Sequence, residues 1–271
     1  MSFRQESRYV TVNSIKVHYV VSGCGPPLLL LHGLGASAVT WRDNVDPLSH
    51  AFRVYALDLP GHGESDKPVI DYDSNSILQF LVLIIDKLGM DKPSIIGNSV
   101  GGALALMIAL RHPDKVSKLV LVNSASLGRD LNFFLRLVSI PLLGKFLDRP
   151  NMNGTEIMLN KIFHDRSFVT HDLVTEISRS RSLPGAKEAV LKVIRNSVNL
   201  MGVRKEYILL DQLKSLETPL MVVWGTQDKI LPVSHAHHAL KKAPNAKHST
   251  TTHHSRNLSC SLARNLPCKE M

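Results

Sequence analysis

The sequence has few cysteines, and their positions exclude the architectures that depend on them. Only Cys24, Cys260 and Cys268 occur in 271 residues. Their number is odd, and their spacing fits neither a disulfide framework nor a metal site built on cysteines. We therefore expect a protein of a reducing compartment, the cytoplasm, that binds no metal.

Uninterrupted hydrophobic runs long enough to cross a bilayer are also lacking. The two most apolar segments are residues 77–88 and 131–147, and the second is broken by charged residues, proline and glycine. A membrane helix needs about 20 apolar residues. The first eight residues carry charge and no apolar core, so we expect no secretory signal. We interpret both apolar segments as buried or cleft-lining helices and expect no membrane partner.

The sequence contains no motif in which basic and aromatic residues are interleaved. Its formal charge is +9, and aromatic residues make up 6% of the chain. A basic balance can indicate nucleic acid, but here the basic residues are scattered along the chain. We interpret the charge as a solvated basic surface and expect no nucleic-acid partner. Nothing in the sequence indicates the oligomeric state.

What the sequence does contain is an alternation of strand and helix patterns. Residues 9–12 and 15–21 predict an antiparallel hairpin, and Ser74 or Ser76 is the expected N-cap of a helix that has Gly89 as its C-cap. Alternating strands and helices are typical of an α/β fold with a mostly parallel sheet covered on both faces. Further strands are predicted at residues 28–31, 53–57, 118–122 and 219–224 and before Gly97, and further helices at 41–48 and 103–110.

The alternation stops at residues 129–212, which are helical in character and contain no convincing strand. A helical insert between two strands of one sheet is expected over their carboxyl ends, where ligands bind in open α/β sheets. We predict a core of residues 1–128 and 213–271 and a helical cap of residues 129–212. The apolar cap residues Phe133 and Phe134 are candidates for substrate binding.

Residues 97–101 read G-x-S-x-G between a predicted strand and a predicted helix. A serine on such a turn stands clear of the backbone, and glycines on both sides let strand and helix approach closely. The amino end of the following helix presents N–H groups to negative charge. This pattern predicts that Ser99 is a nucleophile, although an ordinary turn with a chance serine shares the spacing.

Four motifs, in this order, make the chain resemble the α/β-hydrolase superfamily from about Tyr9 to Lys247. They are His-Gly-Leu-Gly from His32, Asp-Leu-Pro-Gly-His-Gly from Asp58, the serine motif, and Trp-Gly-Thr-Gln-Asp from Trp224. The resemblance implies an α/β-hydrolase fold with a helical cap insertion and no cofactor. It also implies a catalytic triad in the chain order Ser, Asp, His.

The resemblance assigns roles to single residues. Ser99 is the expected nucleophile, and Asp228 is expected to orient the catalytic histidine, although a turn residue that caps the next helix would look the same. The amides of Leu34 and Val100 are the expected oxyanion hole. Asp58 is interpreted as a structural brace of the turn that follows it. Gly33 and Asn98 are expected beside the substrate.

The catalytic histidine is harder to locate, because the chain departs from the superfamily pattern after Lys247. The superfamily has a strand, a Gly-His pair and an amphipathic helix there, whereas residues 248–271 are poor in apolar residues and show no period. We therefore expect the strand and helix to be missing and a sheet edge to be exposed. Our hypothesis is that this tail comes from a shifted reading frame or a truncated gene.

Superfamily spacing counted from Asp228 ends near Arg256, so His254 is the preferred candidate for the base and His253 the second. The alternative is a polar tail that contains histidines by chance. His32 is interpreted as structural. Three further histidines follow Asp228 closely and are interpreted as a helix surface: His235, His237 and His238.

The resemblance implies a serine hydrolase that acts on a small hydrophobic carbonyl compound through an acyl-enzyme. One branch cleaves carboxylic esters, and another cleaves C–C bonds of vinylogous diketones. The serine motif and residues 44–47 resemble the second branch, whose cap arginine has a counterpart in Arg179 or Arg181 unless these form a solvated helix face. Serine at position 99 argues against epoxide hydrolases and dehalogenases. The alternative is a catalytically impaired or non-catalytic homologue without a proper histidine.

Overall fold

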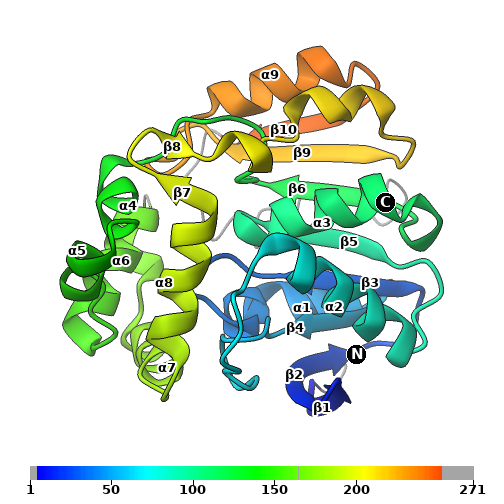
Figure 1. The fold of residues 1–271 in the computed structure, drawn as a ribbon. Helices are drawn as coiled ribbons and strands as arrows, with labels where there is room; N and C mark the ends of the chain where they lie inside the picture. Colours follow the sequence, from blue (N-terminus) through cyan, green and yellow to red (C-terminus); the bar gives the residue numbers. More distant parts are fainter. Residues whose placement is uncertain (1–4, 164, 252–271) are drawn as a thin grey trace.

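The computed structural model describes residues 5–163 and 165–251. Within them, eight strands form one twisted sheet in the order β1-β2-β4-β3-β5-β6-β9-β10 (Figure 1). Their bounds are β1 Glu6–Val12, β2 Ile15–Ser22, β3 Pro27–Leu31, β4 Arg53–Leu57, β5 Ser94–Asn98, β6 Leu119–Val122, β9 Leu220–Gly225 and β10 Lys247–Thr251.

The sheet is parallel except at its amino-terminal edge. β1 and β2 form the predicted antiparallel hairpin, and β2 joins β4 antiparallel. The strands from β4 to β10 all pair in parallel, with Leu30 of β3 opposite Ala56 of β4 and Ile96 of β5. Parallel strands are buried on both faces, which explains why β3 is a continuous run of leucines. The predicted α/β fold with a mostly parallel sheet is confirmed.

Helices cover both faces of the sheet. Alternate strand residues face opposite ways, so Leu28 and Leu30 pack towards α1 (Arg42–Ser49), and Leu29 and Leu31 pack towards the other face. That other face is covered by α2 (Ser74–Lys87), α3 (Val100–Arg111) and α9 (Ser234–Lys242).

Five helices of the insert between β6 and β9 gather at the carboxyl ends of the parallel strands (Figure 1). They are α4 (Phe133–Val138), α5 (Pro141–Leu147), α6 (Met152–Ile162), α7 (His171–Arg181) and α8 (Ala186–Ser197). The expectation that this insert has no strand is wrong, because β7 (Val198–Asn199) and β8 (Gly202–Val203) form a short antiparallel pair. We propose that residues 129–212 are the cap.

The N-cap of α2 also differs from the prediction. The side chain of Asp73 accepts hydrogen bonds from the amides of Asn75 and Ser76, so Asp73 is the N-cap and Ser74 is already helical. An aspartate here adds negative charge at the positive end of the helix. Gly89 follows the C-cap with a φ of +64°.

The predicted loss of the last strand is wrong as well. β10 pairs with β9 along five residues, from Lys247 opposite Met221 to Thr251 opposite Gly225. An edge strand needs only backbone hydrogen bonds on one side, so a polar segment without hydrophobic alternation can form it. The superfamily's closing helix would fall in residues 252–271, which lie outside the described residues. The hypothesis about the origin of the tail, residues 248–271, stays a prediction.

Candidate active site

Ser99 lies at a sharp turn between β5 and α3, as predicted. Its backbone has φ +52° and ψ −113°, a conformation that is strained for a residue with a side chain. Three backbone hydrogen bonds hold it there: its amide donates to the Val122 carbonyl at 2.9 Å, and its carbonyl accepts from the amides of Ala103 and Ala125, each at 3.1 Å. Such strain is typical of the nucleophile turn of this fold.

The glycines around Ser99 are required by close packing. A Cβ atom on Gly97 would lie 2.3 Å from the Gly101 carbonyl oxygen, and one on Gly101 would lie 2.4 Å from the Leu31 carbonyl oxygen. No side chain fits at either distance. This confirms the predicted close approach of strand and helix, and it brings Ser99 near the end of β3.

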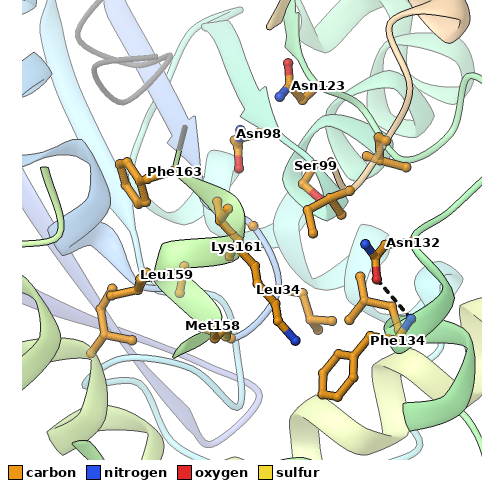
Figure 2. Close-up of a pocket in the computed structure, with 18 of the residues that line it drawn as sticks. Leu34, Asn98, Ser99, Asn123, Asn132, Phe134, Met158, Leu159, Lys161 and Phe163 are labelled. Atoms are coloured by element: carbon orange, nitrogen blue, oxygen red, sulfur yellow. Dashed lines mark hydrogen bonds between the residues drawn. The ribbon is translucent and has the colours of Figure 1, made fainter. Parts of the chain in front are cut away.

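A cavity of about 280 Å³ separates the sheet edge from the cap helices, and Ser99 and Asp228 both line it. Figure 2 shows Ser99 and Asn98 on one side of it, with Leu34, Phe134 and Lys161 across from them. Of the predicted site residues, those that line this cavity are Gly33, Leu34, Asn98, Ser99, Phe134 and Asp228.

Two other predicted site residues are placed differently. Phe133 is not among the lining residues, and it is 67% exposed, so its predicted role in substrate binding is wrong. The residues of α4 that line the cavity are Phe134, Leu135 and Val138. Val100 is the first residue of α3, directly after Ser99. The oxyanion hole of Leu34 and Val100 remains a proposal.

Asp228 lies in the turn after β9, where its carboxylate has three donors. One oxygen accepts hydrogen bonds from the amides of Ile230 at 2.7 Å and Leu231 at 3.0 Å, and the other accepts from the Asn123 side chain. Burial raises the pKa of Asp228, and the three hydrogen bonds oppose that rise. Because α9 begins only at Ser234, Asp228 braces its own turn and does not cap that helix.

Asn123 is a site residue that the sequence reasoning missed. It follows β6 directly and has a φ of +45°, and its side-chain nitrogen donates to the Asp228 carboxylate. Its position directly after a predicted parallel strand could have identified Asn123 as a site residue. Ser99 and Asp228 also follow such strands, and the carboxyl ends of parallel strands share one edge of the sheet.

The histidines differ in their placement. The His32 ring is buried, donates from Nδ1 to the Gly33 carbonyl at 2.7 Å and accepts at Nε2 from the Leu59 amide at 3.0 Å. Burial lowers its pKa, so it is a neutral structural residue, as predicted. His237 and His238 are exposed on α9, also as predicted. His253 and His254 lie outside the described residues.

The interpretation of His235 as surface is wrong. Its side chain is buried against Trp224 and Gly128, and a Cβ atom on Gly128 would lie 2.3 Å from the ring. Burial lowers the pKa of His235. The helix pattern alone does not reveal this burial, because the covering residues come from distant parts of the chain.

Asp58 lies away from the cavity and braces its turn, as predicted. Its carboxylate accepts hydrogen bonds from the amides of Ala38 and Glu64 and contacts His18 Nδ1 at 2.8 Å. Burial alone would raise the pKa of Asp58, but these partners hold it below its ordinary value.

The two cap arginines of α7 have different surroundings. Arg179 is exposed and pairs with Glu64 at 2.6 Å, which fits a solvated helix face. Arg181 is buried, lines the cavity and forms an ion pair with Asp148. The solvated interpretation is therefore wrong for Arg181.

A family model described as alpha/beta hydrolase fold matches residues 26–254. The chain belongs to the α/β-hydrolase superfamily. Among the described residues no helix combines the length and the hydrophobicity that a bilayer crossing requires.

Several superfamily members are similar over most of the chain. A protein of Mycobacterium tuberculosis without an assigned function is 32% identical over 250 residues, which are 89% of this chain and 72% of that protein. A 2-hydroxy-6-oxononadienedioate/2-hydroxy-6-oxononatrienedioate hydrolase of Comamonas testosteroni is 29% identical over 89% of this chain and 86% of its own length. The structure of a meta-cleavage product hydrolase of Pseudomonas fluorescens is 26% identical, with a TM-score of 0.76 over 90% of this chain and 88% of that one.

Proposed function

We propose that this chain is a serine hydrolase that cleaves a small hydrophobic carbonyl compound through an acyl-enzyme at Ser99. The observation that carries the proposal is that a serine with positive φ and an aspartate held by three hydrogen bonds line the same cavity under the cap. The Ser99 oxygen attacks the carbonyl carbon, and the amides of Leu34 and Val100 bind the resulting oxyanion. The leaving group departs with a proton, and water then releases the acyl group.

We propose His254 as the base, with His253 as the second choice. β10 ends at Thr251, opposite Gly225, and Gly225 lies three residues before Asp228. In the sequence, positions 253 and 254 follow the last residue of β10 by two and three residues. The family model also extends to residue 254. His254→Ala and His253→Ala, compared by kcat, identify the base.

Two bond types are compatible with this mechanism. The relatives named as hydrolases of dienedioates and of meta-cleavage products support C–C bond cleavage, and so does the Gly-Asn-Ser-Val-Gly-Gly motif. The apolar lining, which includes Phe134, Val138, Met158 and Leu159, suits an ester with a hydrophobic acyl group equally well. Rates on p-nitrophenyl acyl esters and on a dienol-ketone separate the two branches.

A second candidate function is binding of such compounds without turnover. It is favoured by one observation: among the described residues that line the cavity there is no histidine. Without a base, the serine keeps its proton and only the weak catalysis of an oxyanion hole remains.

A fluorophosphonate probe decides between the two functions, because it reacts with activated serines. We expect labelling at Ser99 that disappears in Ser99→Ala. It should persist in the control Ser215→Ala, which replaces a solvent-exposed serine outside the cap. Ester or C–C hydrolysis falls by about 10³-fold or more in Ser99→Ala. Absence of labelling in protein with an intact circular dichroism spectrum would refute the hydrolase and support the binding protein.

A further inference from the structure

One charged pair inside the cavity limits which substrates fit, and this inference rests on the proposed function. The guanidinium of Arg181, at the end of α7, forms an ion pair with Oδ1 of Asp148, which follows α5. The side chains are 7% and 10% exposed, and both line the cavity. A second contact, from Arg181 Nη1 to the Met158 sulfur at 3.4 Å, fixes the guanidinium further.

Arg181 lies close to the reacting end of the cavity. A Cβ atom on Gly35 would be 3.5 Å from the Arg181 Nε atom, and Gly35 follows Leu34, the proposed oxyanion residue. A free arginine at this place would be a strong site for a substrate carboxylate, because its planar fork matches two oxygens. Here Asp148 already pairs with one nitrogen of that fork, Nη2, and the Met158 sulfur contacts the other, Nη1.

A substrate carboxylate would have to displace Asp148 or approach it. Displacement leaves a buried aspartate without its partner, which is strongly unfavourable. Approach without displacement brings two negative charges together where little water screens them. The two other cations that line the cavity, Arg149 and Lys161, are exposed, and water screens their attraction for anions.

The remaining oxygen of Asp148 has a different preference. Its Oδ2 atom is buried and has no hydrogen-bond partner among the described residues. A buried carboxylate oxygen without a donor is unfavourable. Because neighbouring atoms cover Oδ2, a ligand N–H or O–H group reaches it only when a neighbouring side chain moves, and a ligand that does so gains a strong hydrogen bond.

We propose that Asp148 is a specificity-determining residue: by neutralising Arg181 it makes the cavity select uncharged carbonyl compounds that carry a hydrogen-bond donor, and reject compounds that carry a carboxylate. Within the proposed function this favours neutral esters over anionic dienoates as substrates.

The test measures binding without turnover. In Ser99→Ala, isothermal titration calorimetry compares 4-phenylbutyramide with 4-phenylbutyrate, which differ in charge and in the donor but hardly in shape. We expect the amide to bind at least tenfold more tightly, which corresponds to about 1.4 kcal/mol. Adding Asp148→Asn should tighten phenylbutyrate binding at least tenfold, and adding Arg181→Met to that double variant should remove the gain.

Glu64→Gln is the matched control, because it frees Arg179 on the same helix outside the cavity, and it should change neither affinity. The measurements on Ser99→Ala alone can already overturn the inference. They do so if the two ligands bind equally, if phenylbutyrate binds more tightly, or if neither ligand binds. Failure of fluorophosphonate labelling, in contrast, would refute the hydrolase and leave the ligand preference standing.

Discussion

Asn123 connects the ends of two neighbouring strands by holding Asp228. Its side-chain nitrogen donates to the Asp228 carboxylate, and its side-chain oxygen accepts from the Gly225 amide at 3.2 Å. Each polar atom of the amide therefore has a fixed partner, and the carboxylate is oriented from β6 as well as from its own turn. Asn123 is a positioning residue for the proposed triad.

Replacing Asn123 by alanine should lower kcat/KM about 10–100-fold, because the carboxylate loses one of three donors and its fixed orientation. The same change removes a hydrogen bond that opposes the raised pKa of Asp228. That pKa rises further, so less of the carboxylate is ionised at a given pH, and the acidic limb of the kcat/KM profile moves to higher pH. A pH–rate profile of both proteins measures the shift.

The control is Asn196→Ala, whose side chain donates to the Asp71 carbonyl at the surface. It should leave the profile in place. A uniform loss of activity in Asn123→Ala without a shift of the acidic limb would indicate a structural role alone and contradict the assignment.

The packing of β5 against α3 gives a second prediction. Gly101→Ala places a Cβ atom 2.4 Å from the Leu31 carbonyl and 2.6 Å from the His32 carbonyl, both backbone atoms that cannot turn away. We expect a loss of about 2–4 kcal/mol in the free energy of unfolding. Gly89→Ala is the matched control, since Gly89 has a φ of +64° but nothing within 4 Å of its Cβ position. Its cost should be about 1 kcal/mol, and urea denaturation compares the two.

Much of the sheet was predictable because buried parallel strands have a strong local signal. The strand 53–57 was located to the residue, and Ser99 was found from its motif and its neighbours. β10 escaped prediction because its sequence has no hydrophobic alternation, whereas its pairing with β9 is made by the backbone.

Parts of the site depend on contacts between distant residues, and these have no local signal. Asp148 and Arg181 are 33 positions apart, and the sequence around either residue does not reveal that their charges meet in the cavity. The burial of His235 likewise depends on Trp224 and on the absence of a side chain at Gly128.

The two neighbouring phenylalanines of α4 give a third prediction. Phe134 lines the cavity, and the Lys161 ammonium lies 4.3 Å from its ring centroid, whereas Phe133 is 67% exposed. Phe134→Ala should raise KM for a hydrophobic ester about tenfold, because the substrate loses apolar contact. Phe133→Ala should leave KM unchanged. Equal effects of the two variants on KM would contradict the placement of the cavity wall.

Buried histidines make the stability of the fold depend on pH. Burial lowers the pKa of His62 to about 3, with a smaller contribution from the nearby His32, and burial also lowers the pKa values of His32 and His235. A histidine whose folded pKa lies below its unfolded value of about 6.5 contributes its full stability above that pH. As the pH falls, the unfolded state takes up protons that the folded state does not, and stability is lost. For His62 alone the loss at pH 5 is about 2 kcal/mol relative to pH 8.

His235 allows this pH dependence to be separated from other acid effects. Neither of its ring nitrogens has a hydrogen-bond partner among the described residues, so both a neutral and a charged ring are poorly accommodated. His235→Leu keeps the packing on Trp224 and removes the buried polar atoms, and we expect it to stabilise the fold by about 1 kcal/mol at pH 8 and to weaken the loss of stability between pH 8 and pH 5. Replacing the exposed His237 by leucine should do neither. Urea unfolding of both variants at the two pH values measures the difference, and an unchanged pH dependence in His235→Leu would show that this ring is protonated as easily in the folded chain as in the unfolded one.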